Sequence, residues 1–295
     1  MKPAITFFVI ASISFLANQS SKQLSRLSVD VGIVRGDGIL VPVARYESSK
    51  WSTILDQPEK WDRSRRNRPW WVYDTDPHPK QLQLGPFVRF DPGNHSGSGY
   101  VSSYAAMKGF KPSGFYAVAF AATSDSLKIT RFESQSVASI SKVFRSVIDS
   151  VFAAKEGKYV TTLPKDQHYY PTDKYVRSNI PIQYKLYVAA LDHSPKKSEI
   201  AYFTATRSYP DKNCATVSKL SGWLVFDRIN CSPANLIFET DDCDGKMFSP
   251  TFMPYVFFSL DNRDYVLSAV FGWESDSFQV FEHTNSGFTP QLPDE

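Results

Sequence analysis

The sequence is poor in cysteine and has no strong charge imbalance. Of its 295 residues only Cys214, Cys231 and Cys243 are cysteines, and no Cys-x-x-Cys pair or Cys/His cluster with zinc spacing is present. Glycine motifs that cradle phosphates or dinucleotides are also missing. A formal net charge of +3 is small for a nucleic-acid-binding protein, which usually has a stronger and more clustered basic surface. We therefore expect no metal, no cofactor and no nucleic-acid partner.

Long apolar runs are missing except at the N-terminus. Lys2 precedes an apolar stretch from Ala4 to Ala17, and the polar residues Asn18 to Ser21 follow it. This layout is typical of a cleavable signal peptide, and the stretch is shorter than the roughly 20 residues of a membrane-spanning helix. We expect residues 1–19 to be removed on export to an extracellular or periplasmic location, leaving residues 20–295 as one globular domain without a membrane span. An uncleaved anchor or a buried N-terminal strand is the alternative, because no small-x-small cleavage triplet precedes Ser20.

Export would allow the cysteines to form a disulfide. Residues 215–219 and 223–229 have the composition of a β-hairpin that turns at Ser221-Gly222. Such a hairpin would bring Cys214 and Cys231 together at its open end, with Cys243 left over. We therefore predict a Cys214–Cys231 disulfide, and three reduced thiols are the alternative.

Short runs of β-favouring residues recur along the chain between turn residues. The runs that we interpret as strands are 38–46, 81–90, 115–122, 127–132, 184–190, 199–206, 222–229, 235–239, 255–260, 265–271 and 278–281. They predict a β-rich α+β fold of about 10–12 mainly antiparallel strands and meanders. The last three runs predict a three-stranded meander. A propeller-like β architecture is the alternative, because the run 38–46 and this meander resemble pieces of a propeller blade.

One segment has the periodicity of a helix. Apolar residues recur at three- and four-residue steps between Val137 and Phe152, Ser134 or Ser136 can cap the start, and Gly157 can end it. We predict an amphipathic helix near 136–155 that packs its apolar side on a sheet. The proline-containing segments 47–80 and 157–182 are predicted to be long surface loops.

The most distinctive motif combines cations with aromatic side chains between Lys60 and Tyr73. Arginine interacts favourably with aromatic faces, and sugar rings stack on tryptophan, so the motif is typical of a surface for glycans or other polyanions. The candidate binding residues are Trp61, Arg65, Arg66, Arg68, Trp70, Trp71 and Tyr73. The alternative is a loop whose tryptophans pack on the protein body while the arginines stay in water.

Catalytic motifs are weak throughout the chain. A Gly-x-Ser-x-Gly elbow is missing, and all five histidines fall in predicted loops. We therefore expect an exported, non-catalytic binding or surface-interaction protein with a glycan, another polyanion or a protein as its partner. A secreted hydrolase that uses His95 or His168 with Asp166 is one alternative, and a structural component that assembles through strand edges is another. The sequence does not specify the oligomeric state.

Overall fold

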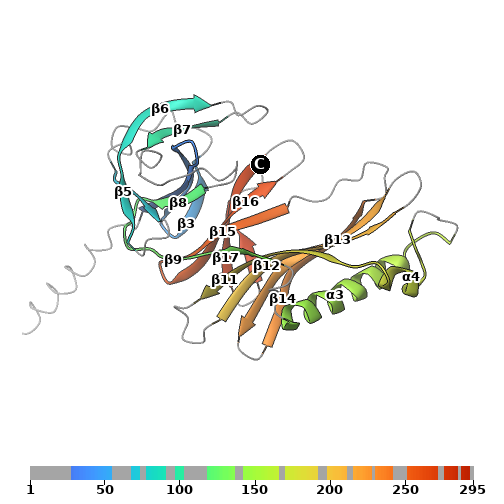
Figure 1. Ribbon diagram of the computed structural model, residues 1–295. Coiled ribbons are helices and arrows are strands. Elements are labelled where there is room, and N and C mark those ends of the chain that lie inside the picture. Colours follow the sequence, from blue (N-terminus) through green and yellow to red (C-terminus); the bar gives the residue numbers. More distant parts are fainter. Residues whose placement is uncertain are drawn as a thin grey trace, which may run out of the picture.

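Among the residues that the structure describes, eighteen strands form three antiparallel sheets, and one of the two helices packs on the outer face of one sheet (Figure 1). The computed structural model describes residues 28–54, 68–73, 78–90, 97–102, 118–136, 142–165, 170–191, 198–210, 215–227, 230–241, 251–271, 276–284 and 287–292. The predicted β-rich α+β fold is confirmed, and each of the eleven predicted runs overlaps a strand. The predicted signal segment 1–19 lies outside the described residues.

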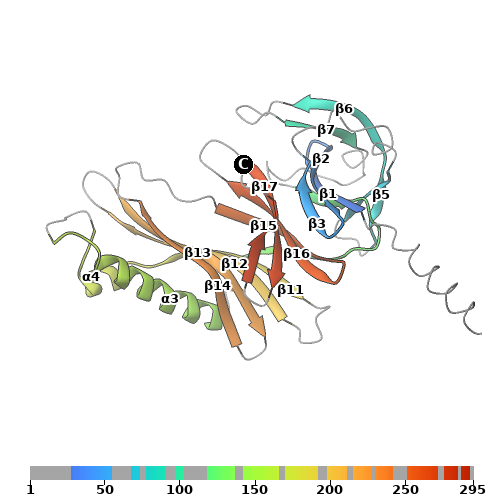
Figure 2. The ribbon, with the colours of Figure 1, turned by 180° about the vertical axis from the view of Figure 1, so that it is seen from behind.

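The N-terminal half of the chain forms the largest sheet, which we call the curled sheet. Its strands are β1 (Ser28–Arg35), β2 (Ile39–Glu47), β3 (Lys50–Thr53), β4 (Trp70–Tyr73), β5 (Lys80–Leu82), β6 (Leu84–Phe90), β7 (Gly97–Ser102) and β8 (Val118–Ala122). They are ordered β5-β4-β8-β1-β2-β7-β6, and β3 pairs with β2. Because only Gln83 separates β5 from β6, the sheet must curl until its two ends approach each other (Figure 2).

A second sheet, which we call the central sheet, is buried on both faces. Its strands are β9 (Lys128–Arg131), β15 (Thr251–Leu260), β16 (Arg263–Phe271), β17 (Asp276–Thr284) and β18 (Gly287–Pro290), ordered β18-β17-β16-β15-β9. Val256 and Phe258 pack against the curled sheet, whereas Phe257 packs in the opposite direction. This alternation follows from the two-residue period of a strand. The pairing of β15, β16 and β17 in sequence confirms the predicted meander.

The third sheet, which we call the helix-covered sheet, packs between the central sheet and a long helix. Its strands, in order, are β10 (Glu133–Gln135), β11 (Gln183–Leu191), β12 (Ser198–Tyr209), β13 (Thr216–Asp227) and β14 (Asn230–Asp241). Helix α3 (Lys142–Val160) buries Phe144, Ile148 and Phe152 against this sheet. A five-residue helix, α4 (Lys174–Ser178), follows. Within the described part of the chain, no helix combines the length and hydropathy that a transmembrane helix needs.

Several predicted boundaries are wrong. Helix α3 continues through Gly157 to Val160. Glycine lowers the intrinsic helix propensity at this position but does not end the helix. No atom lies within 4 Å of the position that a Cβ at Gly157 would occupy. The predicted loop 47–80 contains β3 and β4, and the predicted loop 157–182 contains the end of α3 and all of α4. The three sheets stack in layers and have eight, five and five strands, which is not a repeat of propeller blades.

The hairpin from which the Cys214–Cys231 disulfide is predicted is wrong. Strand β13 runs through Ser221-Gly222 with a bulge and turns after Asp227, so Cys231 pairs with Phe226. Cys214 lies outside the described residues. Cys231 is a free thiol.

The central and helix-covered sheets are joined at both sides of the core between them. On one side β9 leads through Phe132 directly into β10. On the other side the Asn235 amide donates from Nδ2 to the Phe288 carbonyl oxygen at 2.9 Å and accepts from the Phe288 amide at 2.8 Å. Gly287 (φ 126°) is required beside this contact, because a Cβ would lie 2.5 Å from Asn235 Oδ1. A single side chain therefore substitutes for a pair of strand hydrogen bonds.

This contact predicts a cost for Asn235→Gly. Glycine tolerates the positive φ of this residue but cannot make the two hydrogen bonds to Phe288, so we expect a loss of about 2 kcal/mol in unfolding free energy. The matched control is Asn262→Gly, since Asn262 also has a positive φ but lies exposed in the turn between β15 and β16. The control should change stability by less than about 0.5 kcal/mol in urea unfolding. Equal losses in the two variants would contradict this role of Asn235.

Candidate interaction site at the Glu156 cluster

Four of the seven predicted aromatic and basic binding residues lie within the described residues, on or just before β4. Trp61, Arg65 and Arg66 lie outside the described residues. Arg68 is half-buried and donates from Nη1 to the Ser28 hydroxyl at 3.2 Å. Trp71 is half-buried and packs on the core between the curled and central sheets.

Two of the predicted binding residues are core residues instead. Trp70 is 0% exposed, within the core of the curled sheet, so its ring offers no stacking surface. Tyr73 is also buried, and its hydroxyl donates to the Ser124 carbonyl oxygen at 2.6 Å and accepts from the Leu127 amide at 3.0 Å. The sequence interpretation was therefore wrong for Trp70 and Tyr73. Their strand, β4, lies between β5 and β8 and is buried on both faces.

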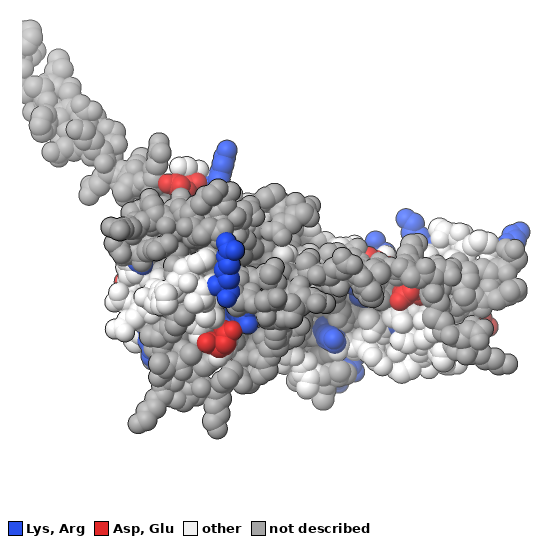
Figure 3. Space-filling view, turned by 90° about the horizontal axis from the view of Figure 1, so that it is seen from above, with Lys and Arg blue, Asp and Glu red and all other residues white. Residues whose placement is uncertain are grey.

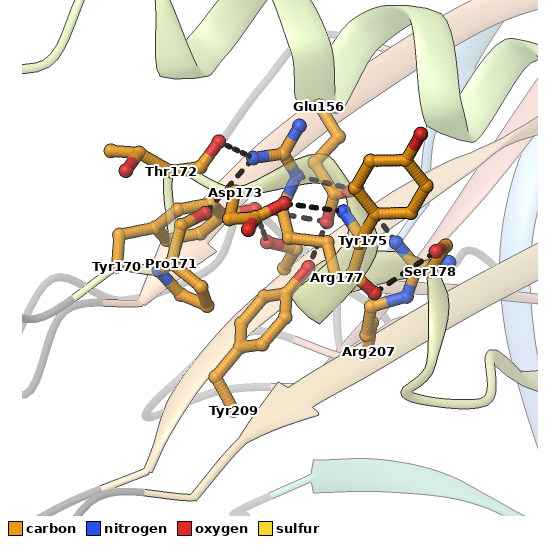
Figure 4. A network of polar contacts seen from close by, with 11 residues as sticks. Glu156, Tyr170, Pro171, Thr172, Asp173, Tyr175, Arg177, Ser178, Arg207 and Tyr209 are labelled. Carbon is orange, nitrogen blue, oxygen red and sulfur yellow. Dashed lines mark hydrogen bonds and ion pairs between the residues drawn. The ribbon is translucent and has the colours of Figure 1, made fainter.

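A buried carboxylate, Glu156, is the centre of a polar cluster at the C-terminal end of α3 (Figure 4). It is 2% exposed and continues the four-residue series of buried positions Phe144, Ile148 and Phe152 along one side of the helix. A charged residue in such a series is the sequence signal that would have revealed this cluster, because a buried charge requires partners.

The partners of Glu156 come from two different elements. Arg207 of β12 donates from Nη1 to Oε2 at 2.6 Å, and Tyr209 of the same strand donates its hydroxyl to Oε1. Tyr170, in the segment after α3, donates to Oε1 at 3.0 Å and also lies 2.7 Å from the Ser218 hydroxyl. The carboxylate therefore links the helix to the sheet beneath it and to the segment that follows.

The fourth partner, Arg177, attaches α4 to the cluster. Its Nε lies 3.5 Å from Glu156 Oε2, and its Nη1 donates to the carbonyl oxygens of Pro171 at 2.9 Å and Thr172 at 2.5 Å. Asp173 caps α4 by accepting from the Tyr175 amide at 2.7 Å. These contacts fix the orientation of a helix that is too short to be stable alone.

The opposite side of α4 is presented to solvent. Tyr175 is 79% exposed and Val176 is 48% exposed, and both directly precede the buried Arg177 in the chain. Four exposed lysines lie on α4 or in the last part of α3 and the segment that follows it. In Figure 3 a few isolated Lys or Arg side chains, with Asp or Glu side chains nearby, stand out at the right-hand end of the molecule. The four exposed lysines are Lys155, Lys158, Lys165 and Lys174. We call α4 together with these lysines the basic tip.

Burial keeps the tyrosines of the Glu156 cluster protonated. Desolvation and, to a smaller extent, the hydrogen bond to Glu156 raise the pKa of Tyr209 to about 12. Desolvation also raises the pKa of Tyr170 far above its usual range. Neutral hydroxyls that donate to a carboxylate hold the negative charge of Glu156 in place, which is a stabilising arrangement rather than the one expected of a catalytic base.

The residues of the predicted hydrolase site are not among those that the structure describes. His95, His168 and Asp166 lie outside them. His283, which we expected in a loop, lies in β17 and stacks on Phe288 with ring centroids 4.8 Å apart, and burial lowers its pKa. No group of three or more metal-ligating side chains occurs in the part of the chain that the structure describes.

Comparisons with protein-family models, curated proteins and solved structures found no match to this chain. The site is therefore interpreted from its own geometry.

The Glu156 cluster predicts a large cost for Glu156→Gln. Glutamine has the same size but no charge, so the guanidinium groups of Arg177 and Arg207 would be buried without a counter-ion, at a cost of about 3–5 kcal/mol in unfolding free energy. Glu282→Gln is the control, because its partner Arg263 is exposed to solvent that screens the charge, and we expect a much smaller loss. Similar denaturation midpoints for the two variants would show that the Glu156 pairs contribute little.

The raised tyrosine pKa values predict a loss of stability in alkali. Below pH 10 both the folded and the unfolded chain keep these protons, so the stabilising effect is fully present. Between pH 10 and about 12 the unfolded chain loses them while the folded chain retains them, so the free energy of unfolding falls as the pH rises. Tyr209→Phe should make this fall shallower in urea unfolding measured across the pH series. A profile parallel to the wild-type one would contradict the assignment.

Proposed function

We propose that the chain is an exported, non-catalytic binding protein that recognises polyanionic surfaces through its basic tip. The main support for this proposal is that buried charged side chains fix the position of α4. Arg177 is buried with Glu156, while its neighbours Tyr175 and Val176 are exposed. Burying Arg177 with Glu156 costs free energy of desolvation, and the helix that this pair holds still exposes apolar side chains. Such a helix is more consistent with a contact surface than with core packing.

The distribution of charge supports an anionic partner. All the described lysines between residues 142 and 185 are exposed. Among the described acidic residues of the same range, only Asp173, the cap of α4, is exposed. The lysines are Lys142, Lys155, Lys158, Lys165, Lys174 and Lys185. Because the whole chain has a net charge of only +3, this region holds a local excess of positive charge. Clustered cations attract polyanions over about a Debye length.

The aromatic and basic segment from Lys60 to Tyr73 contributes fewer candidate binding residues to this proposal than the sequence predicts. Of the described residues, Arg68 and Trp71 retain some exposure and remain candidates for glycan contact together with Trp61, Arg65 and Arg66. Trp70 and Tyr73 are excluded by their burial.

Binding to sulfated and neutral polysaccharides at two salt concentrations tests the proposal. We expect the chain to bind the sulfated polymer and to lose affinity as salt rises. A triple Lys→Gln variant at Lys155, Lys158 and Lys174 should bind about tenfold more weakly or worse, since each exposed charge contributes up to about 1 kcal/mol.

The matched control carries the same change at the exposed lysines of other surfaces, Lys50, Lys80 and Lys128. It should retain nearly all of the binding. An Arg68→Gln, Trp71→Ala variant tests the remaining part of the aromatic and basic segment. Equal losses in the two lysine variants, or no binding to the sulfated polymer, would contradict recognition through the basic tip.

A further inference from the structure

The structure assigns a more specific partner to the basic tip: we propose that it docks on an anionic lipid bilayer, with Tyr175 and Val176 entering the headgroup region. This inference rests on the proposed function and names the polyanion. It concerns peripheral contact at the membrane surface. The argument uses the shape of the tip, the kind of cation that surrounds it and the side chains that it exposes.

The apolar side chains of the tip form a projection rather than a pocket. Helix α4 lies at the end of the helix-covered sheet that is remote from the curled sheet (Figure 1). Tyr175 and Val176 are adjacent on this helix and are two of only four large apolar side chains that are exposed among the described residues. A flat bilayer can receive such a projection without a complementary pocket, whereas a protein partner would need one.

The exposed pair is suited to a membrane interface. Tyrosine is enriched there because its ring enters the apolar region while its hydroxyl remains hydrated. Val176 adds an aliphatic group beside it. Arg177 cannot follow them into the lipid, because Glu156 and two carbonyl oxygens hold it on the protein side. Insertion is therefore limited to the outer side of α4.

The exposed cations of the tip are all lysines, while the nearby arginines point inward. Arg177 and Arg207 are buried with Glu156. Arginine is the residue suited to two-pronged recognition of a carboxylate or a single phosphate, whereas lysine acts as a hydrated point charge on a flexible stem. Lysines around an apolar projection match a diffuse anionic surface of headgroups, and their stems can lie along the lipid while the ammonium groups stay in water. This distinction favours a bilayer over an acidic protein.

Flotation of the full chain with vesicles tests the inference. The vesicles contain either phosphatidylcholine alone or phosphatidylcholine with about a third of phosphatidylserine, a composition chosen to give a strongly negative surface. The apolar residues 4–17 are present in every variant, so binding to the neutral vesicles supplies the baseline. We expect phosphatidylserine to increase binding at least tenfold at low salt and most of that increase to disappear at high salt.

Two variants separate the apolar contribution from the charged one. Tyr175→Ser with Val176→Ser should weaken binding to the anionic vesicles about tenfold, because the burial of these side chains is lost. Lys158→Gln with Lys174→Gln should weaken it by a similar factor at low salt and by much less at high salt. Val143→Ser is the matched control, since Val143 is 45% exposed on the N-terminal turn of α3, away from the tip, and it should bind like the wild type.

The outcomes distinguish this inference from the proposed function. Loss of vesicle binding in both tip variants, with Val143→Ser unchanged, supports the bilayer as partner. Binding to sulfated polysaccharide without a response to phosphatidylserine, or vesicle binding that is unchanged by Tyr175→Ser with Val176→Ser, overturns the inference and leaves the proposed function intact. Failure to bind either polyanion overturns both.

Discussion

A carboxylate buried beside two guanidinium groups is the constraint on which the proposed site depends. Glu156 cannot lie in the interface between α3 and the helix-covered sheet without Arg207, Arg177 and the two tyrosine hydroxyls, because an unpaired buried charge is far more costly than a paired one. Arg207 and Tyr209 come from a well-paired strand, whereas Tyr170 and Arg177 come from the segment that follows α3. The cluster therefore orients α4, and with it the exposed residues Tyr175 and Val176.

The layered sheets provide the rigid base beneath this cluster. The central sheet is apolar on both faces, so it requires the curled sheet on one side and the helix-covered sheet on the other. Helix α3 then covers the remaining face of the helix-covered sheet. The strands β12 and β13 extend from this buried stack to the Glu156 cluster, where they supply Arg207, Tyr209 and Ser218. The basic tip is thus built at the end of well-packed strands rather than on an isolated loop.

Sequence patterns predicted the elements with simple periodicity and failed where burial required a partner from a distant segment. The helix and the meander have clear repeats of apolar residues, and both were found. Strand β1 was missed because Asp30 interrupts its apolar residues, and the structure buries this carboxylate against Arg45 of β2, with Nε and Nη2 at 2.5 and 2.6 Å from its oxygens. Strand β4 was interpreted as a binding loop because aromatic residues that are buried on both faces show no alternation.

Amide hydrogen exchange of α4 in Glu156→Gln tests the central claim most directly. The amides of Arg177 and Asn179, which donate to Asp173 and Tyr175 in the wild type, report whether α4 keeps its structure. If the Glu156 cluster holds this helix, both amides should exchange at nearly unprotected rates in the variant, while those of β16 in the central sheet remain strongly protected. Wild-type protection of the two α4 amides in the variant would contradict the claim that a buried carboxylate fixes the contact surface.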